Sequence, residues 1–177
     1  MQTRIPDIKP GIEFLKYYQI AGGVIGIGLI VPYLIGSAGS LSGLVLLIVF
    51  CFIALYSFSV YCGLLLFRNL KRALAFSRIN QIFQLLSFTV LGFTFRYVSG
   101  LYAFIGFELS GSLGLNFNFG LTSWQVNING NKNDLVVNIN LVAFLLIVVI
   151  EKLLNRIRLK EHSEIIAALG EPVKEDE

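Results

Sequence analysis

The chain has 177 residues, of which 55% are hydrophobic and 14% charged, and its formal net charge is +3 at pH 7. Soluble globular domains carry about 25% charged residues, so this composition argues against a soluble domain and indicates a membrane protein of about one domain. The basic residues are dispersed along the chain rather than gathered in one patch, so nucleic acid is not a default partner.

Two uncharged stretches, at about 17–35 and 44–67, predict membrane spans because a transmembrane helix needs about 20 apolar residues. The first stretch, with basic residues before it and small residues at 36–40 after it, also loosely resembles a cleavable signal sequence. Its apolar core is longer than the usual h-region of about 7 to 15 residues, which favours a retained span.

The first predicted span contains Gly22 and Gly26, four residues apart on one helix face. Small residues at this spacing let two helix backbones approach closely in lipid. We therefore expect a tight helix contact there, either with the other spans of the same chain or with a second subunit.

A third predicted span, at about 79–98, is the most polar of the four. Gln81, Gln84 and Ser87 follow one another at three-residue spacing, so on a helix they would form one polar stripe. In a membrane bundle such a stripe either joins helices by hydrogen bonds or lines a pore.

Between 110 and 139 the pattern changes to alternation of apolar residues with Asn, Gly and Gln. A period of two predicts strands, here at about 113–120, 123–129 and 135–139, with one apolar and one Asn-rich face. We expect a small antiparallel sheet outside the membrane, capped by the bundle, by residues 101–109 or by a neighbouring subunit.

The fourth predicted span, at about 140–157, leads into a cytoplasmic tail at 158–177. The tail keeps helical spacing until Gly170 and Pro172, which predict its end. Arg158 and His162 lie four residues apart on one face, an arrangement that a membrane-anchored nuclease or hydrolase could use but that is commoner on a solvated helix.

The distribution of basic residues predicts that both termini are cytoplasmic, because Lys and Arg are retained on that side of the inner membrane. The only basic residues of the segment expected outside are Lys132 and, at its edge, Arg96. The basic residues expected inside are Arg4, Lys9, Lys16, Arg68, Lys71, Arg72, Arg78, Lys152, Arg156, Arg158, Lys160 and Lys174.

The predicted fold is therefore that of an all-α membrane protein, a four-helix transmembrane bundle with a small antiparallel β-sheet inserted between helices three and four. Residues 1–177 form a single membrane domain in this interpretation.

The sequence contains no paired carboxylates, metal-ligand cluster, nucleophile motif or phosphate loop, so we expect no enzyme, no cofactor and no metal. The favoured function is a non-enzymatic multi-pass subunit, oligomeric or bound to a larger membrane partner, with a passive channel as its close relative.

Two alternatives stay open, a small transporter or ligand sensor that uses the outer β segment, and a hydrolase or nuclease that uses Arg158 and His162. No motif assigns the chain to a family. In layout alone it resembles small accessory membrane proteins of bacterial envelope, secretion, competence and defence systems.

Overall fold

The computed structural model describes residues 9–37, 42–109 and 114–170. The predictions for Arg4, Lys174 and the end of the tail lie outside these ranges. The elements are α1 (Lys9–Gly36), α2 (Gly43–Leu65), α3 (Leu70–Leu85), β1 (Leu86–Val90), β2 (Phe93–Glu108), β3 (Gly114–Ile128), β4 (Val136–Asn140) and α4 (Leu141–Gly170).

The predicted all-α, four-helix transmembrane bundle is wrong. The protein is α/β, with four helices and one four-stranded antiparallel sheet in the described ranges. Among these helices two, Pro10–Gly36 and Gly43–Leu65, are long and apolar enough to cross a membrane.

The third predicted span, 79–98, fails because its second half is a β-hairpin. α3 begins after the N-cap Asn69, whose Oδ1 accepts the Arg72 N–H at 3.1 Å, and it ends at Leu85. Leu91 and Gly92 then form a two-residue loop with φ of 51° and 82°, the left-handed pair that a tight hairpin requires. The stretch is uncharged up to Arg96, but the β-branched and aromatic residues after Leu86 favour strands.

The fourth predicted span and the tail form one continuous helix, α4. Its apolar run ends at Glu151, only ten residues after Leu141, so the helix does not qualify as a span by length and composition. Of the three predicted strands, the first two are one continuous strand, β3, and the third is β4. β1 and β2 were not predicted.

β2 bends at Gly100, whose φ of +115° is left-handed, and its register with β3 shifts at the same place. The bend lets β2 pair with a different strand on either side of Gly100. Before the bend β2 pairs with β1, and after it β2 pairs with β4, while β1 and β4 pair with each other. These three strands therefore close a ring, and β3 is attached to it along β2 as the edge strand.

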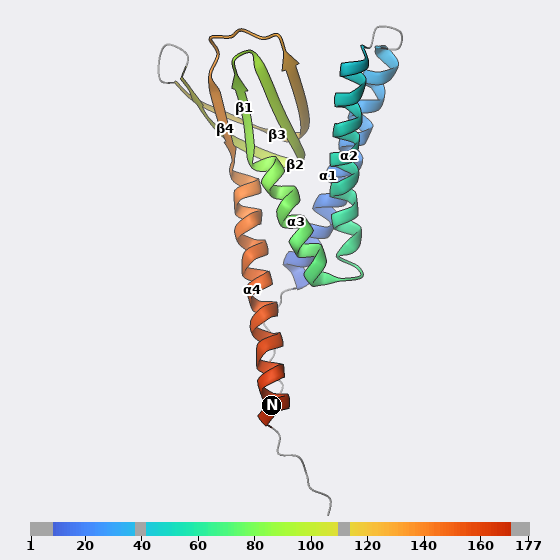
Figure 1. The fold of residues 1–177 in the computed structure, drawn as a ribbon, viewed down its shortest axis with the longest axis vertical. Helices are drawn as coiled ribbons and strands as arrows, with labels where there is room; N and C mark the ends of the chain where they lie inside the picture. Colours follow the sequence, from blue (N-terminus) through green and yellow to red (C-terminus); the bar gives the residue numbers. More distant parts are fainter. Residues whose placement is uncertain (1–8, 38–41, 110–113, 171–177) are drawn as a thin grey trace, which may run out of the picture.

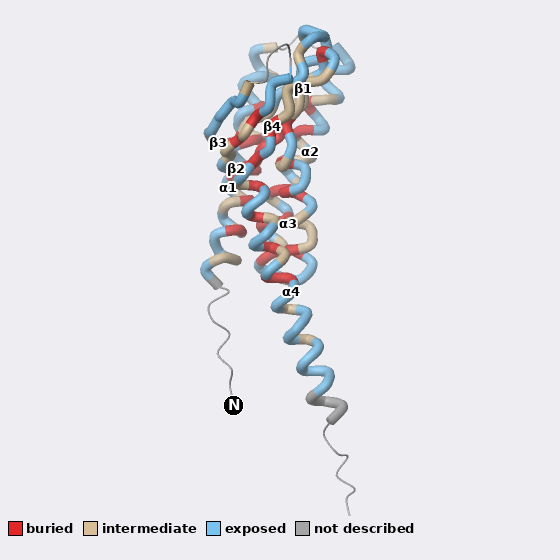
Figure 2. Tube along the Cα trace, turned by 90° about the vertical axis from the view of Figure 1, so that its left-hand side faces the viewer, coloured by how far each residue is buried: buried red, intermediate tan, exposed pale blue. Residues whose placement is uncertain are grey.

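Figure 1 shows α1 and α2 as an antiparallel pair beside the sheet, with α3 and α4 beneath it. α3 runs directly into β1 and β4 runs directly into α4. Figure 2 shows buried residues where helices and sheet meet and where the helices pack together, whereas α4 is mostly exposed from Asn155 to Ile166. One apolar cluster, around Leu15, Leu74 and Ile150, joins α1, α3 and α4, and a second, around Ile30, Phe52 and Tyr97, joins α1, α2 and the sheet.

Candidate functional site: a buried polar cluster inside an apolar exterior

Ser59 of α2 is the centre of a buried hydrogen-bond network. Its hydroxyl donates to the carbonyl of Gln19 at 3.1 Å, and accepts from Asn80 Nδ2 at 3.1 Å and from Ser99 Oγ at 2.9 Å. Ser77 Oγ donates to Gln19 Oε1 at 3.1 Å. We call the fully buried polar residues contributed here by α1, α2, α3 and β2 the polar cluster; they are Gln19, Ser59, Ser77, Asn80, Gln81, Gln84 and Ser99.

The bend of β2 is fixed to the helices by the same cluster. Gln84 Oε1 accepts the Ser99 N–H at 2.9 Å, and the Tyr97 hydroxyl lies 2.9 Å from the carbonyl of Leu55 and 3.2 Å from Asn80 Oδ1. The Gly100 N–H donates to Thr122 Oγ1 at 3.0 Å. Backbone groups that the bend removes from strand pairing are thus satisfied by side chains.

The three predicted stripe residues are all interior. Gln81 and Gln84 are 0% exposed and Ser87 is 2% exposed. Gln84 contacts the sheet, and Ser87, already in β1, lies 3.4 Å from Nε of Arg96. The stripe is therefore split between a helix and a strand. Within the chain, Gln84 joins α3 to β2 and Ser87 joins β1 to β2.

Several amide atoms of the polar cluster have no hydrogen-bond partner among the residues that the structure describes. They are Nε2 of Gln19 and Gln84 and both amide atoms of Gln81. A buried polar group without a partner costs about 1–3 kcal/mol. Gln81, which has neither amide atom paired, therefore lowers stability relative to an apolar residue of similar shape.

Replacing Gln81 with leucine should raise the melting temperature of the purified protein, because the change removes two unpaired polar atoms without breaking a bond. The expected gain is about 1–3 kcal/mol. Gln84→Leu is the matched control and should lower stability, since the Ser99 N–H loses its acceptor. A destabilised Gln81→Leu protein would show that the Gln81 amide is bound in the native protein.

Gly22 and Gly26 contact different elements of the same chain. A Cβ on Gly22 would lie 2.5 Å from the carbonyl carbon of Ser99, and one on Gly26 would overlap the ring of Tyr56. Gly22 thus packs against β2 and Gly26 against α2. The close approach predicted for this pair is made within the chain, and one of its two partners is a strand.

Arg158 and His162 lie exposed on α4, on either side of Glu161, which pairs with Lys71 of α3. The structure does not bring them near the polar cluster. No group of three His, Cys, Asp or Glu side chains that could hold a metal ion occurs in the ranges that the structure describes.

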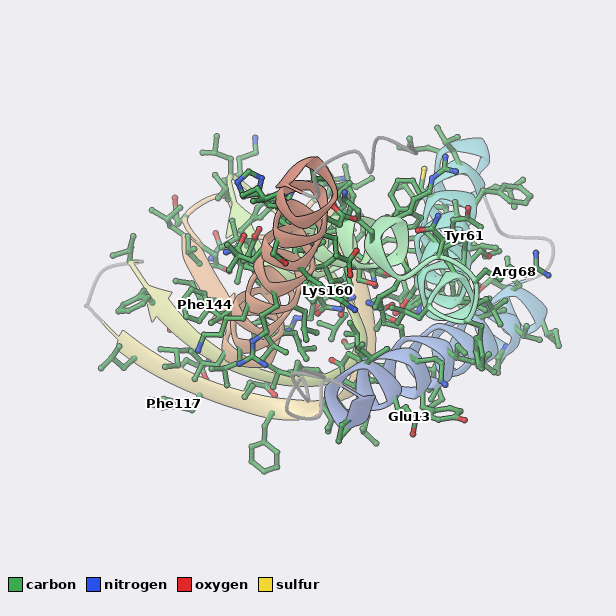
Figure 3. The ribbon with its side chains drawn as sticks, turned by 90° about the horizontal axis from the view of Figure 1, so that it is seen from below. Glu13, Tyr61, Arg68, Phe117, Phe144 and Lys160 are labelled. Carbon is green, nitrogen blue, oxygen red and sulfur yellow. The ribbon has the colours of Figure 1, made fainter. Side chains whose placement is uncertain are left out.

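The part of the sheet that contains β4 has an apolar row facing outward, whereas before the bend Phe95, Tyr97, Trp124 and Val126 pack against α1 and α2. One row across the four strands reads Leu86, Ile139, Ile105 and Phe117, and three of these residues are 36% exposed or more. The adjacent row, which faces the opposite way, reads Ser87, Asn138, Gly106 and Asn116. Figure 3 shows Phe117 on the outer side of the sheet, away from the helices.

The same inversion holds for the helices. Exposed large apolar residues occur on α1, α2, α3 and the first turns of α4, among them Leu29, Leu47, Ile82 and Leu145. In the described ranges the buried polar residues are all uncharged: Gln19, Ser59, Ser77, Asn80, Gln81, Gln84, Ser87, Ser99, Thr122, Asn138 and Asn140.

Charged residues gather at one end of the molecule, where α1 and α3 begin, α2 ends and α4 extends. Two ion pairs join α3 to α4 there, Lys71 to Glu161 at 2.6 Å and Arg78 to Glu151 at 2.5 Å. At the same end, a surface hollow of about 440 Å³ is lined by Tyr61, Leu64, Leu65, Phe67 and Arg68.

Comparison of the chain with protein families, with curated proteins and with solved structures finds no match. The function must therefore be inferred from the residues of this chain.

Most of the polar cluster, including Gln19, Ser59 and Ser99, was not predicted from the sequence. A signal for the first two was present, since each is a polar residue inside a predicted span. Ser99 had no such signal, because its role follows from the bend of β2.

Proposed function

We propose that this protein is an integral membrane protein in which α1 and α2 cross the bilayer and the sheet lies beside them at the depth of the hydrocarbon. It acts as a non-enzymatic membrane subunit. The observation that supports this most is the inverted polarity, with amides and hydroxyls buried and large apolar side chains exposed on helices and sheet alike. Lipid is the solvent that favours this arrangement.

The contacts between α1 and the sheet support the proposed depth. The Tyr18 hydroxyl donates to the carbonyl of Leu101 at 2.9 Å, and the ring of Tyr33 packs against Trp124 at 5.1 Å. These contacts are fifteen residues apart on α1, about 22 Å of helix at about 1.5 Å per residue. That length is most of a hydrocarbon core of about 30 Å.

The closed ring of strands is compatible with such a position because it satisfies backbone hydrogen bonds. No water is present in hydrocarbon, so non-helical backbone must be satisfied within the protein. β1, β2 and β4 pair with one another in a ring, and buried side chains bind the backbone at the bend.

The charges support an orientation with the lower end of Figure 1 in the cytoplasm of a bacterial inner membrane. Basic residues of α3 and α4 lie at that end, and the positive-inside rule retains them there. Lys16 stacks on the ring of Phe67 at 4.1 Å, and Phe67 and Tyr61 line the same hollow. Cations beside aromatic rings are typical of a membrane–water interface.

A non-enzymatic role is supported by the chemistry of the interior. The polar cluster consists of amides and hydroxyls, to which Tyr97 adds a phenol, and none of these is activated by a neighbouring base or metal ligand in the described part of the chain. Neutral groups of this kind position helices and strands rather than transfer protons.

Cysteine labelling tests the proposed depth in a Cys51→Ser, Cys62→Ala background. Leu86→Cys, on the outward face of β1, should resist a water-soluble maleimide in intact cells and react only after detergent is added. Lys132→Cys, in the exposed turn before β4, should react from outside, and His162→Cys only after permeabilisation. A Leu86→Cys thiol that reacts as fast as Lys132→Cys in membranes would contradict the proposal, as would a protein that stays soluble without detergent.

A further inference from the structure

The outer edge of β3 has no partner strand. β3 pairs with β2 along its length, and no other described strand pairs with it. Its first half projects beyond the helices, with Leu115, Phe117, Phe119 and Leu121 64–86% exposed. This half therefore presents both an apolar row and a free backbone edge.

The edge lacks the features that normally prevent strands from pairing. Soluble proteins protect edges with charged residues, proline or bulges. From Gly114 to Ile128 there is no charged residue and no proline. If the sheet lies at hydrocarbon depth, as the proposed function holds, unpaired N–H and C=O groups each cost several kcal/mol. Lipid covers the apolar row but offers these groups no hydrogen bonds.

The sequence of this half is self-complementary. It reads Leu-Asn-Phe-Asn-Phe-Gly-Leu from 115 to 121, so that the same apolar residues follow in both directions from Asn118. A two-fold interface requires such a pattern, because each residue must fit its counterpart in a second copy.

We propose that β3 pairs with β3 of a second copy of this chain, antiparallel, about a two-fold axis at Asn118. Phe117 then lies opposite Phe119 of the second copy, and Leu115 opposite Leu121. This register joins the two apolar rows into one continuous lipid-facing surface. A shift by one residue would instead place apolar residues opposite asparagines, because side chains alternate between faces.

Asn118→Cys, in the background without Cys51 and Cys62, tests this register. Directly opposed residues of antiparallel strands have Cα atoms about 4.5–5.5 Å apart, within the range of a disulfide. Oxidation of membranes with copper phenanthroline should convert most of the Asn118→Cys protein to a species of twice the 19.7 kDa chain mass, reversible by thiols.

Asn116→Cys is the matched control, since it lies on the same face of the same strand and is also exposed. In the proposed register residue 116 and its copy are four residues apart along the strands, about 13 Å, and should stay monomeric. No cross-link with Asn118→Cys, or equal cross-linking of both variants, overturns the proposal.

Membranes are washed at alkaline pH, and the cross-link is measured in the fraction that contains the protein, either the membrane pellet or the soluble supernatant. A membrane-bound protein without the cross-link contradicts the pairing alone. A soluble protein contradicts the proposed function, and the cross-link then still reports on the edge. A cross-link to a different polypeptide would identify a heterologous partner and equally overturn the pairing of two copies.

Discussion

Gly22→Leu should detach α1 from the sheet and strongly lower the stability of the protein. The three atoms that a Cβ would meet, at 2.5–2.8 Å, all belong to the backbone of Ser99 and Gly100. No side chain can rotate away to make room. Overpacking costs about 1–3 kcal/mol when side chains can adjust, so a loss of about 3 kcal/mol or more is expected, or about 6–12 °C in melting temperature.

Gly28→Leu is the matched control, because Gly28 lies on the same helix with nothing within 4 Å of its Cβ position. Its leucine would meet no other part of the described chain and should leave stability nearly unchanged. Thermal unfolding in detergent can be followed by the fluorescence of Trp124, the single tryptophan, which packs against Tyr33 and Phe52 at the interface between helices and sheet. Equal melting temperatures for the two variants would contradict a direct contact between α1 and β2.

Hydropathy located α1 and α2 because each is a long, continuous apolar run. The same measure failed at 79–98, where the end of a helix and a hairpin together form one largely uncharged run. The distinguishing features there were local, namely Gly92 in a two-residue loop and alternation on either side of it. The alternation of apolar and polar residues predicted strands after 113, where asparagines separate the apolar residues. The same alternation, with serine and threonine as the polar residues, was overlooked within 79–98.

The candidate site depended on long-range geometry that spacing cannot supply. Gln84 and Ser87 were selected as one helical stripe, but the chain changes from helix to strand between them, and their partners Ser99 and Arg96 come from β2. The glycine pair was expected at a contact with another helix, but only Gly26 lies against one, α2. The partner of Gly22, the bend of β2, could not be anticipated without knowing that Gly100 adopts a left-handed conformation.

Ser59→Ala should destabilise the protein by about 2–6 kcal/mol, because one hydroxyl serves three partners. Its removal leaves Asn80 Nδ2 and Ser99 Oγ without the acceptor that they share, and each unpaired buried group costs about 1–3 kcal/mol. α2, α3 and β2 meet at this hydroxyl, so the loss should weaken their association as a unit. The melting temperature in detergent measures this effect.

Ser57→Ala is the matched control, because Ser57 is exposed two residues away on the same helix. It tests whether any serine-to-alanine substitution in α2 destabilises the protein. It should melt within about 1–2 °C of the unaltered protein, as surface substitutions cost less than about 0.5 kcal/mol. Asn80→Leu combined with Ser59→Ala should cost less than the sum of the two single changes, because both remove the same bond. Strict additivity would mean that the two side chains are not paired, and the polar cluster would then not join the helices to the sheet.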